Sequence, residues 1–307
     1  MKLIAIFVFL SIAAVSNGFA QHLRIYACAI GNDSVGASMG GSSNGSGLYQ
    51  SDDTGKTWKR LGWDNIKCYS MDMVQSSNGR ILYEATGLGI LRSVDGGEHW
   101  KQITDWRISE AMDVAVNQKN PSEIYTATAH GPWRTMDGGK KWMALHDGLP
   151  LPYTSRIVVD TSIDEHVLLA SEAGIFALSS ANWKQIPCEQ INIRNEVQKN
   201  VSEIRCIVQN SRSSWIAAAE NSRELISSDS AKSFGTPGYG DSGIWAISEI
   251  SLGRDHDMTE LGGNWGHSTW DRNDDESRQF RDDKIKNVSS ILQIPIPYDM
   301  GGHNEPR

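Results

Sequence analysis

The sequence predicts an all-β fold, a six-bladed β-propeller of four-stranded antiparallel blades. Three observations lead to this prediction. An eight-residue pattern, S/T-x-D-x-G-x-x-W, recurs, and the tryptophans of its strong copies, Trp58, Trp100 and Trp142, stand 42 residues apart. Short apolar runs bounded by Gly, Asn and Pro surround each copy, as expected of β-strands. A repeat of this length with four such runs matches one propeller blade.

Each repeat contains the runs needed for four strands. One run lies well upstream of the motif, a second and third lead into it across a turn, and a fourth begins at its last residues. In the unit around the second copy, these predicted strands cover residues 71–74, 81–86, 89–93 and 99–103.

Weaker copies become visible once the 42-residue spacing says where to look. The fourth keeps its tryptophan as Trp183, the fifth keeps Asp229 and ends at Phe234, and the sixth ends at Phe280. The six copies occupy residues 51–58, 93–100, 135–142, 179–186, 227–234 and 273–280.

The two ends of the repeat array predict how the ring closes. Residues 24–29 correspond to a second strand, so the first unit lacks its innermost strand, whereas residues 288–294 read as an innermost strand with nothing after it. Pairing of the two would complete one blade and leave no exposed sheet edge. We therefore expect residues 21–307 to form a single propeller domain.

The first twenty residues read as a secretion signal. Lys2 precedes an apolar run over residues 3–15, and the small residues Gly18 and Ala20 suit signal peptidase. The run is too short to span a bilayer comfortably, and no basic stop-transfer cluster follows it, which disfavours a retained anchor. We expect removal of residues 1–20, an extracellular or periplasmic location, and no membrane attachment afterwards.

Charge and cysteine content narrow the function classes. The net charge is −8, and the absence of a basic tract disfavours nucleic-acid binding. The four cysteines permit two disulfides in an exported protein, with three pairings open, and four buried thiols fit nearly as well. Their spacing has no metal-site signature, so we expect neither metal nor cofactor. The cysteines are Cys28, Cys68, Cys188 and Cys206.

The repeated pattern resembles the Asp-box, or bacterial neuraminidase repeat, family of propellers. That family includes sialidases, other glycoside hydrolases, sortilin-type receptors and a photosystem assembly factor, and the resemblance covers nearly all of residues 22–296. It implies that the motif hairpins lie on the face opposite the catalytic one. In the motif itself, Asp95 can accept backbone N–H bonds, Gly97 permits a left-handed turn, and Trp100 packs between sheets.

The resemblance to sialidases fails at one informative position. Sialidases begin an innermost strand with an Arg-Ile-Pro triplet, whose arginine holds the substrate carboxylate. The equivalent strand here has Gln293 at that position. Sialidase activity is therefore not expected, although Arg156 and Arg205 begin other innermost strands and could hold an anion.

Candidate site residues lie in two sets of loops on the opposite face: those between blades, and those between the second and third strand of each blade. Such loops on a rigid ring commonly carry function. Aromatic side chains stack on sugar rings, and charged groups fix hydroxyls or a carboxylate. The catalytic candidates are Glu110, Glu172, Glu220, Asp241 and His130, and the substrate-binding candidates are Arg156, Arg205, Tyr69, Tyr239, Trp106, Trp265 and His267.

These residues favour a secreted carbohydrate-active propeller that acts on a glycan or polysaccharide. A glycoside hydrolase would need two carboxylates about 5 to 10 Å apart, whereas a polysaccharide lyase would use His130 or Tyr239 as base and Arg205 against a uronate. The alternative is a non-catalytic propeller that binds glycans or protein partners through the same face. We expect Glu110, Glu172, Glu220, Arg156 and Arg205 to project into one cavity, and we predict no particular oligomeric state.

Overall fold

A computed structural model describes residues 23–29, 46–52, 57–64, 66–77, 79–160, 166–191, 197–199, 204–209, 215–219, 224–235, 244–251, 257–263, 266–271 and 290–295. Every helix or strand assigned in these residues is a β-strand. The predicted signal at residues 1–20 and the sixth motif copy at residues 273–280 lie outside the described residues. No helix in the described segments is long and apolar enough to cross a membrane.

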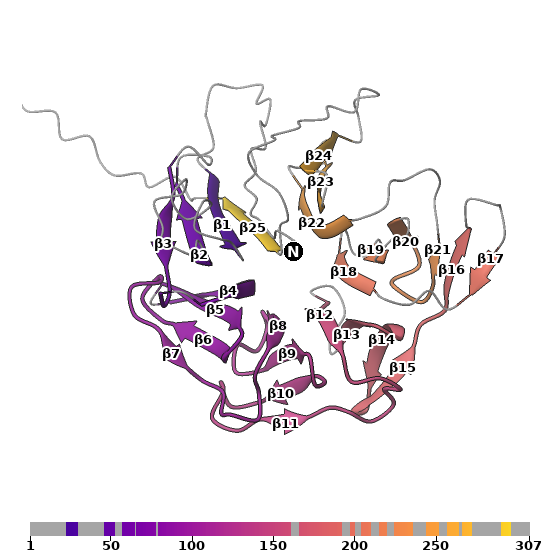
Figure 1. The fold of residues 1–307 in the computed structure, drawn as a ribbon, viewed down its shortest axis with the longest axis horizontal. Helices are drawn as coiled ribbons and strands as arrows, with labels where there is room; N and C mark the ends of the chain where they lie inside the picture. The colour runs from indigo at the N-terminus through magenta and orange to yellow at the C-terminus, as the bar shows by residue number, and fades with distance from the viewer. Residues whose placement is uncertain are drawn as a thin grey trace, which may run out of the picture.

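The strands form sheets arranged around a common centre (Figure 1). The first sheet contains β25 (Ser290–Pro295), β1 (Leu23–Ala29), β2 (Gly47–Ser51) and β3 (Lys59–Leu61). The second contains β4 (Cys68–Ser76), β5 (Gly79–Thr86), β6 (Gly89–Ser93) and β7 (Lys101–Gln102). The third contains β8 (Ala111–Val116), β9 (Ile124–Thr128), β10 (Trp133–Thr135) and β11 (Met143–Ala144).

The remaining sheets continue the order around the ring. The fourth contains β12 (Thr154–Val159), β13 (Val167–Ser171), β14 (Gly174–Ser179) and β15 (Asn182–Gln185). The fifth contains β18 (Ile204–Gln209), β19 (Trp215–Ala219), β20 (Glu224–Ser227) and β21 (Phe234–Gly235), extended by β16 (Cys188–Ile191) and β17 (Val197–Lys199). The sixth contains β22 (Ile244–Ser251), β23 (Asp257–Gly263) and β24 (Gly266–Asp271).

The first four sheets are four-stranded and antiparallel, which confirms the predicted content of a unit. The fifth sheet differs from the prediction, because β16 and β17 add to its outer edge and β16 runs parallel to β21. This pairing joins Cys188 to Phe234, a contact too distant in sequence for a local pattern to reveal.

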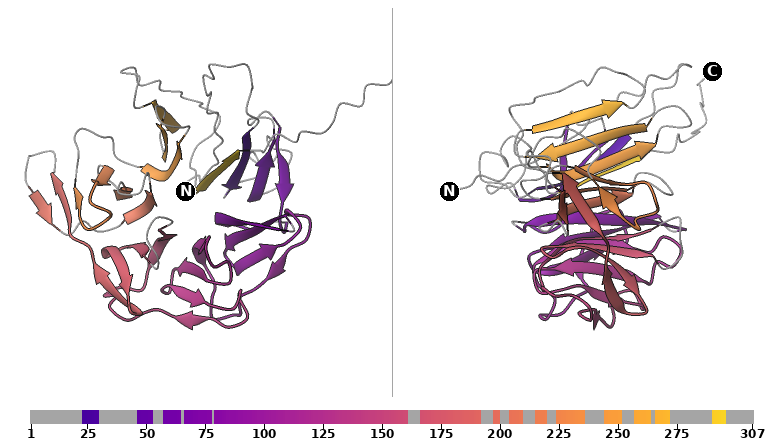
Figure 2. Two further views of the ribbon diagram at one scale, coloured as in Figure 1. Left: turned by 180° about the vertical axis from the view of Figure 1, so that it is seen from behind. Right: turned by 90° about the vertical axis from the view of Figure 1, so that its right-hand side faces the viewer.

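The innermost strands line the centre and contact one another in order, β4 with β8, β8 with β12, β12 with β18, β18 with β22, β22 with β25, and β25 with β4. Figure 1 and the left view of Figure 2 show β25 beside β1. The two strands pair in antiparallel register, with Arg24 opposite Ile294. The strand at the end of the sequence thus pairs with the first described strand.

A β-bulge recurs near the start of the innermost strands. Bulges bend a strand and redirect its side chains, so this irregularity marks the same structural position in successive sheets. The register shifts fall between Cys68 and Ser70, Ala111 and Asp113, Thr154 and Arg156, Ile204 and Cys206, and Ile244 and Ala246.

The aromatic residue of the repeated pattern anchors each sheet to the preceding one. Trp142 is 8% exposed and packs with Tyr83 and Ala85 of the second sheet. Trp183 of the fourth sheet packs in the same way with Tyr125 of the third. Burial of such large rings is a major contribution to the interface between sheets.

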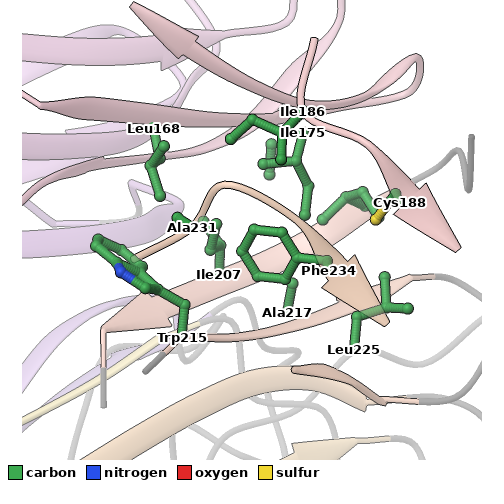
Figure 3. Close-up of a cluster of buried hydrophobic side chains, with 12 residues drawn as sticks. Leu168, Ile175, Ile186, Cys188, Ile207, Trp215, Ala217, Leu225, Ala231 and Phe234 are labelled. Atoms are coloured by element: carbon green, nitrogen blue, oxygen red, sulfur yellow. The ribbon is translucent and has the colours of Figure 1, made fainter. Parts of the chain in front are cut away.

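Phe234 takes the same role in the fifth sheet (Figure 3). Its side chain is 3% exposed and lies in a cluster with Ile175 of β14 and Ala217 of β19. The weakened copy of the pattern therefore keeps its packing function although phenylalanine replaces the tryptophan. Burial of a Phe side chain stabilises the folded state by about 1.5–3 kcal/mol.

The motif aspartates are structural, as the sequence predicted. Ser93 Oγ donates to Asp95 Oδ1 (2.8 Å), which also accepts the backbone N–H groups of Glu98 (3.1 Å) and His99 (3.0 Å). These bonds, chiefly that from the His99 N–H, hold the pKa of Asp95 well below its ordinary value. Asp137 and Asp229 accept the corresponding bonds in their own turns.

The second motif glycine is required by both conformation and packing. Gly97 and Gly139 have φ of +102° and +92°, in the left-handed region. A Cβ on Gly139 would lie 2.8 Å from Ile103 Cδ1 of the preceding sheet. The fifth copy adopts the left-handed region without glycine, at Ser230 (φ +63°) and Ala231 (φ +59°), which costs about 1–2 kcal/mol per residue.

A disulfide joins Cys28 of the first sheet to Cys68 of the second. Because Cys188 is a free thiol, the structure matches neither the two disulfides nor the four free thiols that the sequence left open. Cys188 is a buried free thiol, and desolvation raises its pKa to about 12. The low reactivity of a buried neutral thiol fits a structural role for Cys188.

Candidate functional site

One side of the ring, which we call the loop face, is formed by two sets of connections. It contains the turns that join the second and third strand of each sheet and the loops that lead from one sheet to the next. Hydrogen bonds lock the two sets together: the Glu110 N–H donates to the Gly87 carbonyl (3.0 Å), and the Ile90 N–H donates to Thr104 Oγ1 (3.1 Å). These bonds fix the turn after β5 and the loop before β8 relative to each other.

The turns on this face share a motif that our sequence interpretation missed. The Thr86 hydroxyl donates to the Gly89 carbonyl (2.8 Å) and accepts the N–H of Leu88 (3.1 Å). The repeated signal is T/S-x-x-G, found at residues 86–89, 128–131 and 171–174. Its hydroxyl holds each turn in one shape, as a serine or threonine turn does elsewhere, and so positions the residues at the tip.

Glu110 has an unusual backbone conformation on this face. Its φ is +48°, in the left-handed region that non-glycine residues rarely adopt. Its carbonyl accepts the N–H of Ala129 (3.2 Å), while its own N–H is bound to Gly87. The neighbouring turns thus hold the residue in a conformation that costs about 1–2 kcal/mol relative to the ordinary one.

The side chain of Glu110 lies beside that of His130. Both residues are among the predicted catalytic candidates. Glu110 Oε2 is 3.6 Å from His130 Nε2, and the side chains are 55% and 66% exposed. A carboxylate and an imidazole at this separation pair ionically when the imidazole is protonated. Both remain open to solvent and to a ligand.

Tyr69 shares this neighbourhood. Desolvation raises the pKa of its phenol, and the Glu110 carboxylate and Tyr153 add to that effect. The phenol therefore stays protonated at neutral pH and remains a hydrogen-bond donor. The structure brings together the predicted residues Tyr69, Glu110 and His130.

Large apolar side chains are also exposed in the described connections of the loop face. Trp106, in the loop between β7 and β8, is 88% exposed, which is extreme for a residue type that is highly buried on average. The adjacent Arg107 guanidinium lies 5.6 Å from the centre of the Trp133 ring and donates two bonds to Asp105. Other large apolar side chains exposed on the same face are Trp63 (38%), Leu88 (56%) and Leu151 (45%).

The remaining described candidates take different positions. Arg156 forms an ion pair with Asp113 (3.3 Å), and these side chains are only 13% and 8% exposed. Asp113 also accepts the N–H of Ile157 (2.9 Å), so the pair joins two innermost strands. Glu172 is half-buried, and its N–H donates to the Tyr153 carbonyl (3.4 Å), next to the loop before β12.

Several predicted residues cannot be placed. Glu220, Tyr239, Asp241 and Trp265 lie outside the described residues, and Arg205 and His267 lie on β18 and β24 at positions whose side chains are not described. The expectation that five of the candidates share one cavity therefore stays a prediction.

Two cavities of the described residues lie beside the motif turns. The larger, of about 620 Å³, lies against Trp142 and between the motif turns of Asp95 and Asp137. The other, of about 470 Å³, also contacts Asp95. Because turn hydrogen bonds already occupy these carboxylates, cavity volume alone does not identify a catalytic site here.

Two carboxylates elsewhere have strongly raised pKa values. Desolvation raises the pKa of Asp72 on β4 to about 7, although bonds from the Val116 and Met73 N–H groups oppose the shift. Glu84 on β5 is completely buried, and desolvation raises its pKa to about 8 against the opposing charge of Arg60. Neither carboxylate oxygen of Glu84 has a hydrogen-bond partner among the described residues.

Sequence reasoning missed Glu84, although a signal was present. Glu84 is the one charged residue of the run ILYEAT at residues 81–86. Its burial between the first and second sheets leaves it beside Gly62, where a Cβ would lie 2.8 Å from Glu84 Oε2. Glu84 is therefore sealed from ligands, and it affects stability rather than binding.

The described part of the chain contains no group of three or more His, Cys, Asp or Glu side chains that could hold a metal ion. The exposed carboxylate, imidazole, phenol and indole of the loop face instead suit a ligand with hydroxyl groups and an apolar surface, because they combine hydrogen-bonding groups with a flat ring.

No family model matches the sequence, and no curated protein matches it. Among solved structures, the extracellular domain of the two component system BT4673 from B. thetaiotaomicron is 12% identical with a TM-score of 0.61, over 93% of this chain and 36% of that chain. An ancestral GH74 enzyme is 15% identical with a TM-score of 0.49, over 81% of this chain and 36% of that chain. YCF48 bound to D1 peptide is 12% identical with a TM-score of 0.46, over 86% of this chain and 96% of that chain.

The chain thus spans about 36% of the length of the BT4673 domain and of the GH74 enzyme. The likeness to the BT4673 domain shows a shared fold, and together with the sheets around a common centre it identifies this chain as a β-propeller.

Proposed function

We propose that this protein is a secreted six-bladed β-propeller of the Asp-box type that binds a carbohydrate on its loop face. The ring contacts of the innermost strands and the pairing of β25 with β1 support six blades closed between the two terminal strands. The hairpin bonds of Asp95, Asp137 and Asp229 support the Asp-box interpretation, and the signal predicted at residues 1–20 supports export.

The observation that carries the binding proposal is Glu110. A left-handed glutamate is less stable than a glycine or asparagine would be at the same position, yet its carboxylate is exposed beside His130. Strain of this kind is commonly kept where a side chain has a function. The simplest function for an exposed carboxylate close to a phenol, at the end of the loop that exposes the Trp106 indole, is recognition of a sugar.

Each side chain then has a defined role. The exposed ring of Trp106 stacks on the apolar face of a pyranose. Glu110 accepts hydrogen bonds from sugar hydroxyls, whereas Tyr69 donates one. His130, 3.6 Å from the carboxylate, can hydrogen-bond a second hydroxyl of the same sugar.

A hydrolase or lyase is the catalytic form of this proposal. A hydrolase would need a second carboxylate across from Glu110, for which Glu172, Glu220 and Asp241 remain candidates. A general acid also needs a pKa raised by burial, whereas the Glu110 side chain is 55% exposed. The described geometry therefore favours binding over turnover, and a propeller that binds a protein partner through the same face is the alternative.

The test is a binding and turnover assay on purified protein. Neutral, sialylated and uronate oligosaccharides are titrated by isothermal calorimetry, and parallel incubations are checked for new reducing ends or unsaturated products. Trp106→Ala should weaken binding, while Met143→Ala, an apolar residue 54% exposed on the outer strand β11, should not. Binding without products selects the binding module, and no binding to any glycan refutes the proposal.

A further inference from the structure

We infer that the loop face selects an uncharged glycan, one without carboxylate or sulfate groups. This inference rests on the proposed function and concerns the charge of the ligand. It follows from how the charged side chains of this face are already paired within the described residues.

The arginine best placed to clamp an anion is already neutralised. Arg156 pairs with Asp113 at 3.3 Å, and both side chains are almost entirely buried. Moving Arg156 toward a ligand would leave the Asp113 carboxylate buried without its partner, which is strongly unfavourable. Arg156 therefore links two innermost strands and is not free to hold a ligand carboxylate.

Among the described residues of this face, Arg107 is also engaged. Arg107 donates to both Asp105 oxygens (2.9 and 2.7 Å) and lies over the Trp133 ring. These contacts fix the loop that presents Trp106, so releasing Arg107 would disturb the platform on which the ligand rests.

Arg60 has a similar structural role at the edge of this face. It donates to the carbonyls of Ser46 (2.8 Å) and Trp63 (3.2 Å) and pairs with Asp64 (3.2 Å). Its guanidinium thereby holds together two segments of the first sheet instead of offering a fork to an anion.

The carboxylates, in contrast, are available. Glu110 has one charged neighbour, the His130 imidazole at 3.6 Å, and Glu172 has no ion pair among the described residues. Lys67 is exposed on this face, but a single hydrated lysine at the surface attracts an anion weakly. An anionic ligand on Trp106 would approach an exposed negative charge.

Hydroxyl groups suit this arrangement. A protein carboxylate accepts hydrogen bonds from two neighbouring hydroxyls of an uncharged sugar. In a uronate, a carboxylate replaces one hydroxyl-bearing carbon, and its negative charge repels the carboxylate of the protein. The resulting selectivity is electrostatic, so it should weaken as salt is added.

The test compares ligands that differ chiefly in charge, and the glucose and xylose hexamers and the salt dependence separate charge from the added methyl groups. Hexamers of galacturonic acid and their fully methyl-esterified form are titrated into the full chain by calorimetry at low and high salt, with glucose and xylose hexamers as further uncharged probes. We expect the ester to bind at least about tenfold more tightly than the acid at low salt. Glu110→Gln should reduce this ratio, and Lys67→Gln should leave the preference for the ester in place.

The outcomes separate this inference from the proposed function. Equal or tighter binding of the acid, with Trp106→Ala still weakening it, would overturn the charge selectivity while the glycan-binding function stands. Absence of binding to every hexamer would overturn both. If Glu110→Gln leaves the ratio of affinities for ester and acid unchanged, the acid is rejected for a reason other than the Glu110 charge. That result would also refute the inference.

Discussion

Replacing Glu84 with glutamine should make the protein more stable at alkaline pH. Glu84 is completely buried, has no hydrogen-bond partner for either oxygen among the described residues, and has a pKa raised from 4.5 to about 8 by desolvation. The folded protein therefore holds a proton on Glu84 that the unfolded chain releases above pH 4.5.

The sign and size of the effect follow from these values. Because the folded pKa is the higher one, the contribution of Glu84 to stability is fully present below pH 4.5 and is lost as pH rises through about 8. At about 1.4 kcal/mol per pH unit, the wild-type protein should lose roughly 5 kcal/mol over that window through this residue. Glutamine has a similar shape and does not titrate, so Glu84→Gln should lack this loss.

The assay is urea unfolding followed by tryptophan fluorescence at pH 4, 6, 8 and 9, with the disulfide intact. The difference in free energy of unfolding between variant and wild type should grow with pH. Glu98→Gln serves as the matched control, because Glu98 is 64% exposed in a surface pair with Lys59 and should show no such trend. Parallel pH profiles for Glu84→Gln and wild type would refute the reasoning and indicate that the carboxylate is solvated or paired.

Three further substitutions test the loop face, a motif turn and the disulfide. Glu110→Gly removes the strain at φ +48° and should raise the free energy of unfolding by about 1 kcal/mol while abolishing glycan binding; thermal unfolding and calorimetry on the same sample check both effects, and a variant that still binds would contradict the assigned role. Gly139→Ala should destabilise by about 1–3 kcal/mol more than Gly138→Ala, because both positions have positive φ but Gly139 alone would clash with Ile103; equal losses in urea unfolding would argue against the clash. Removing the disulfide with Cys28→Ser and Cys68→Ser, 40 residues apart, should cost about 4 kcal/mol by the loop-entropy relation, and an unchanged unfolding midpoint would show that the bond does not constrain the unfolded chain.

The repeat could be predicted because its determinants are local. A hydroxyl, a carboxylate and an aromatic ring within eight residues make a complete turn and its anchor. Even the degenerate copy at Ser227 keeps the bonds from its hydroxyl and from Asp229, although Ser230 and Ala231 replace the glycines. The number of strands per unit follows from the same local spacing.

Features that depend on distant contacts escaped the sequence. Asp72 and Asp113 read as ordinary polar positions, but each accepts an N–H from the next innermost strand, 44 residues away. The pairing of Cys28 with Cys68 depends on β1 lying beside β4. The pairing of β16 with β21 depends on contacts between sheets, and none of these contacts leaves a periodic trace.

The candidate site was only partly predictable for the same reason. Tyr69, Glu110 and His130 could be selected because the repeat identified the loops of one face. Arg156 begins a strand on that face as expected, but its charge is matched by Asp113, which the sequence does not place nearby. Burial of Glu84 depends on both neighbouring sheets, so its strand alone marks an unusual charge without saying that it is buried.

Calorimetric titration of wild-type protein, Trp106→Ala and Met143→Ala with uncharged hexasaccharides tests the central claim most directly. We expect one of these sugars to bind the wild-type protein and Met143→Ala equally, and to bind Trp106→Ala at least about tenfold more weakly, a loss of about 1.4 kcal/mol. Equal affinity for all three proteins, or no binding by any of them, would contradict a glycan site on the loop face.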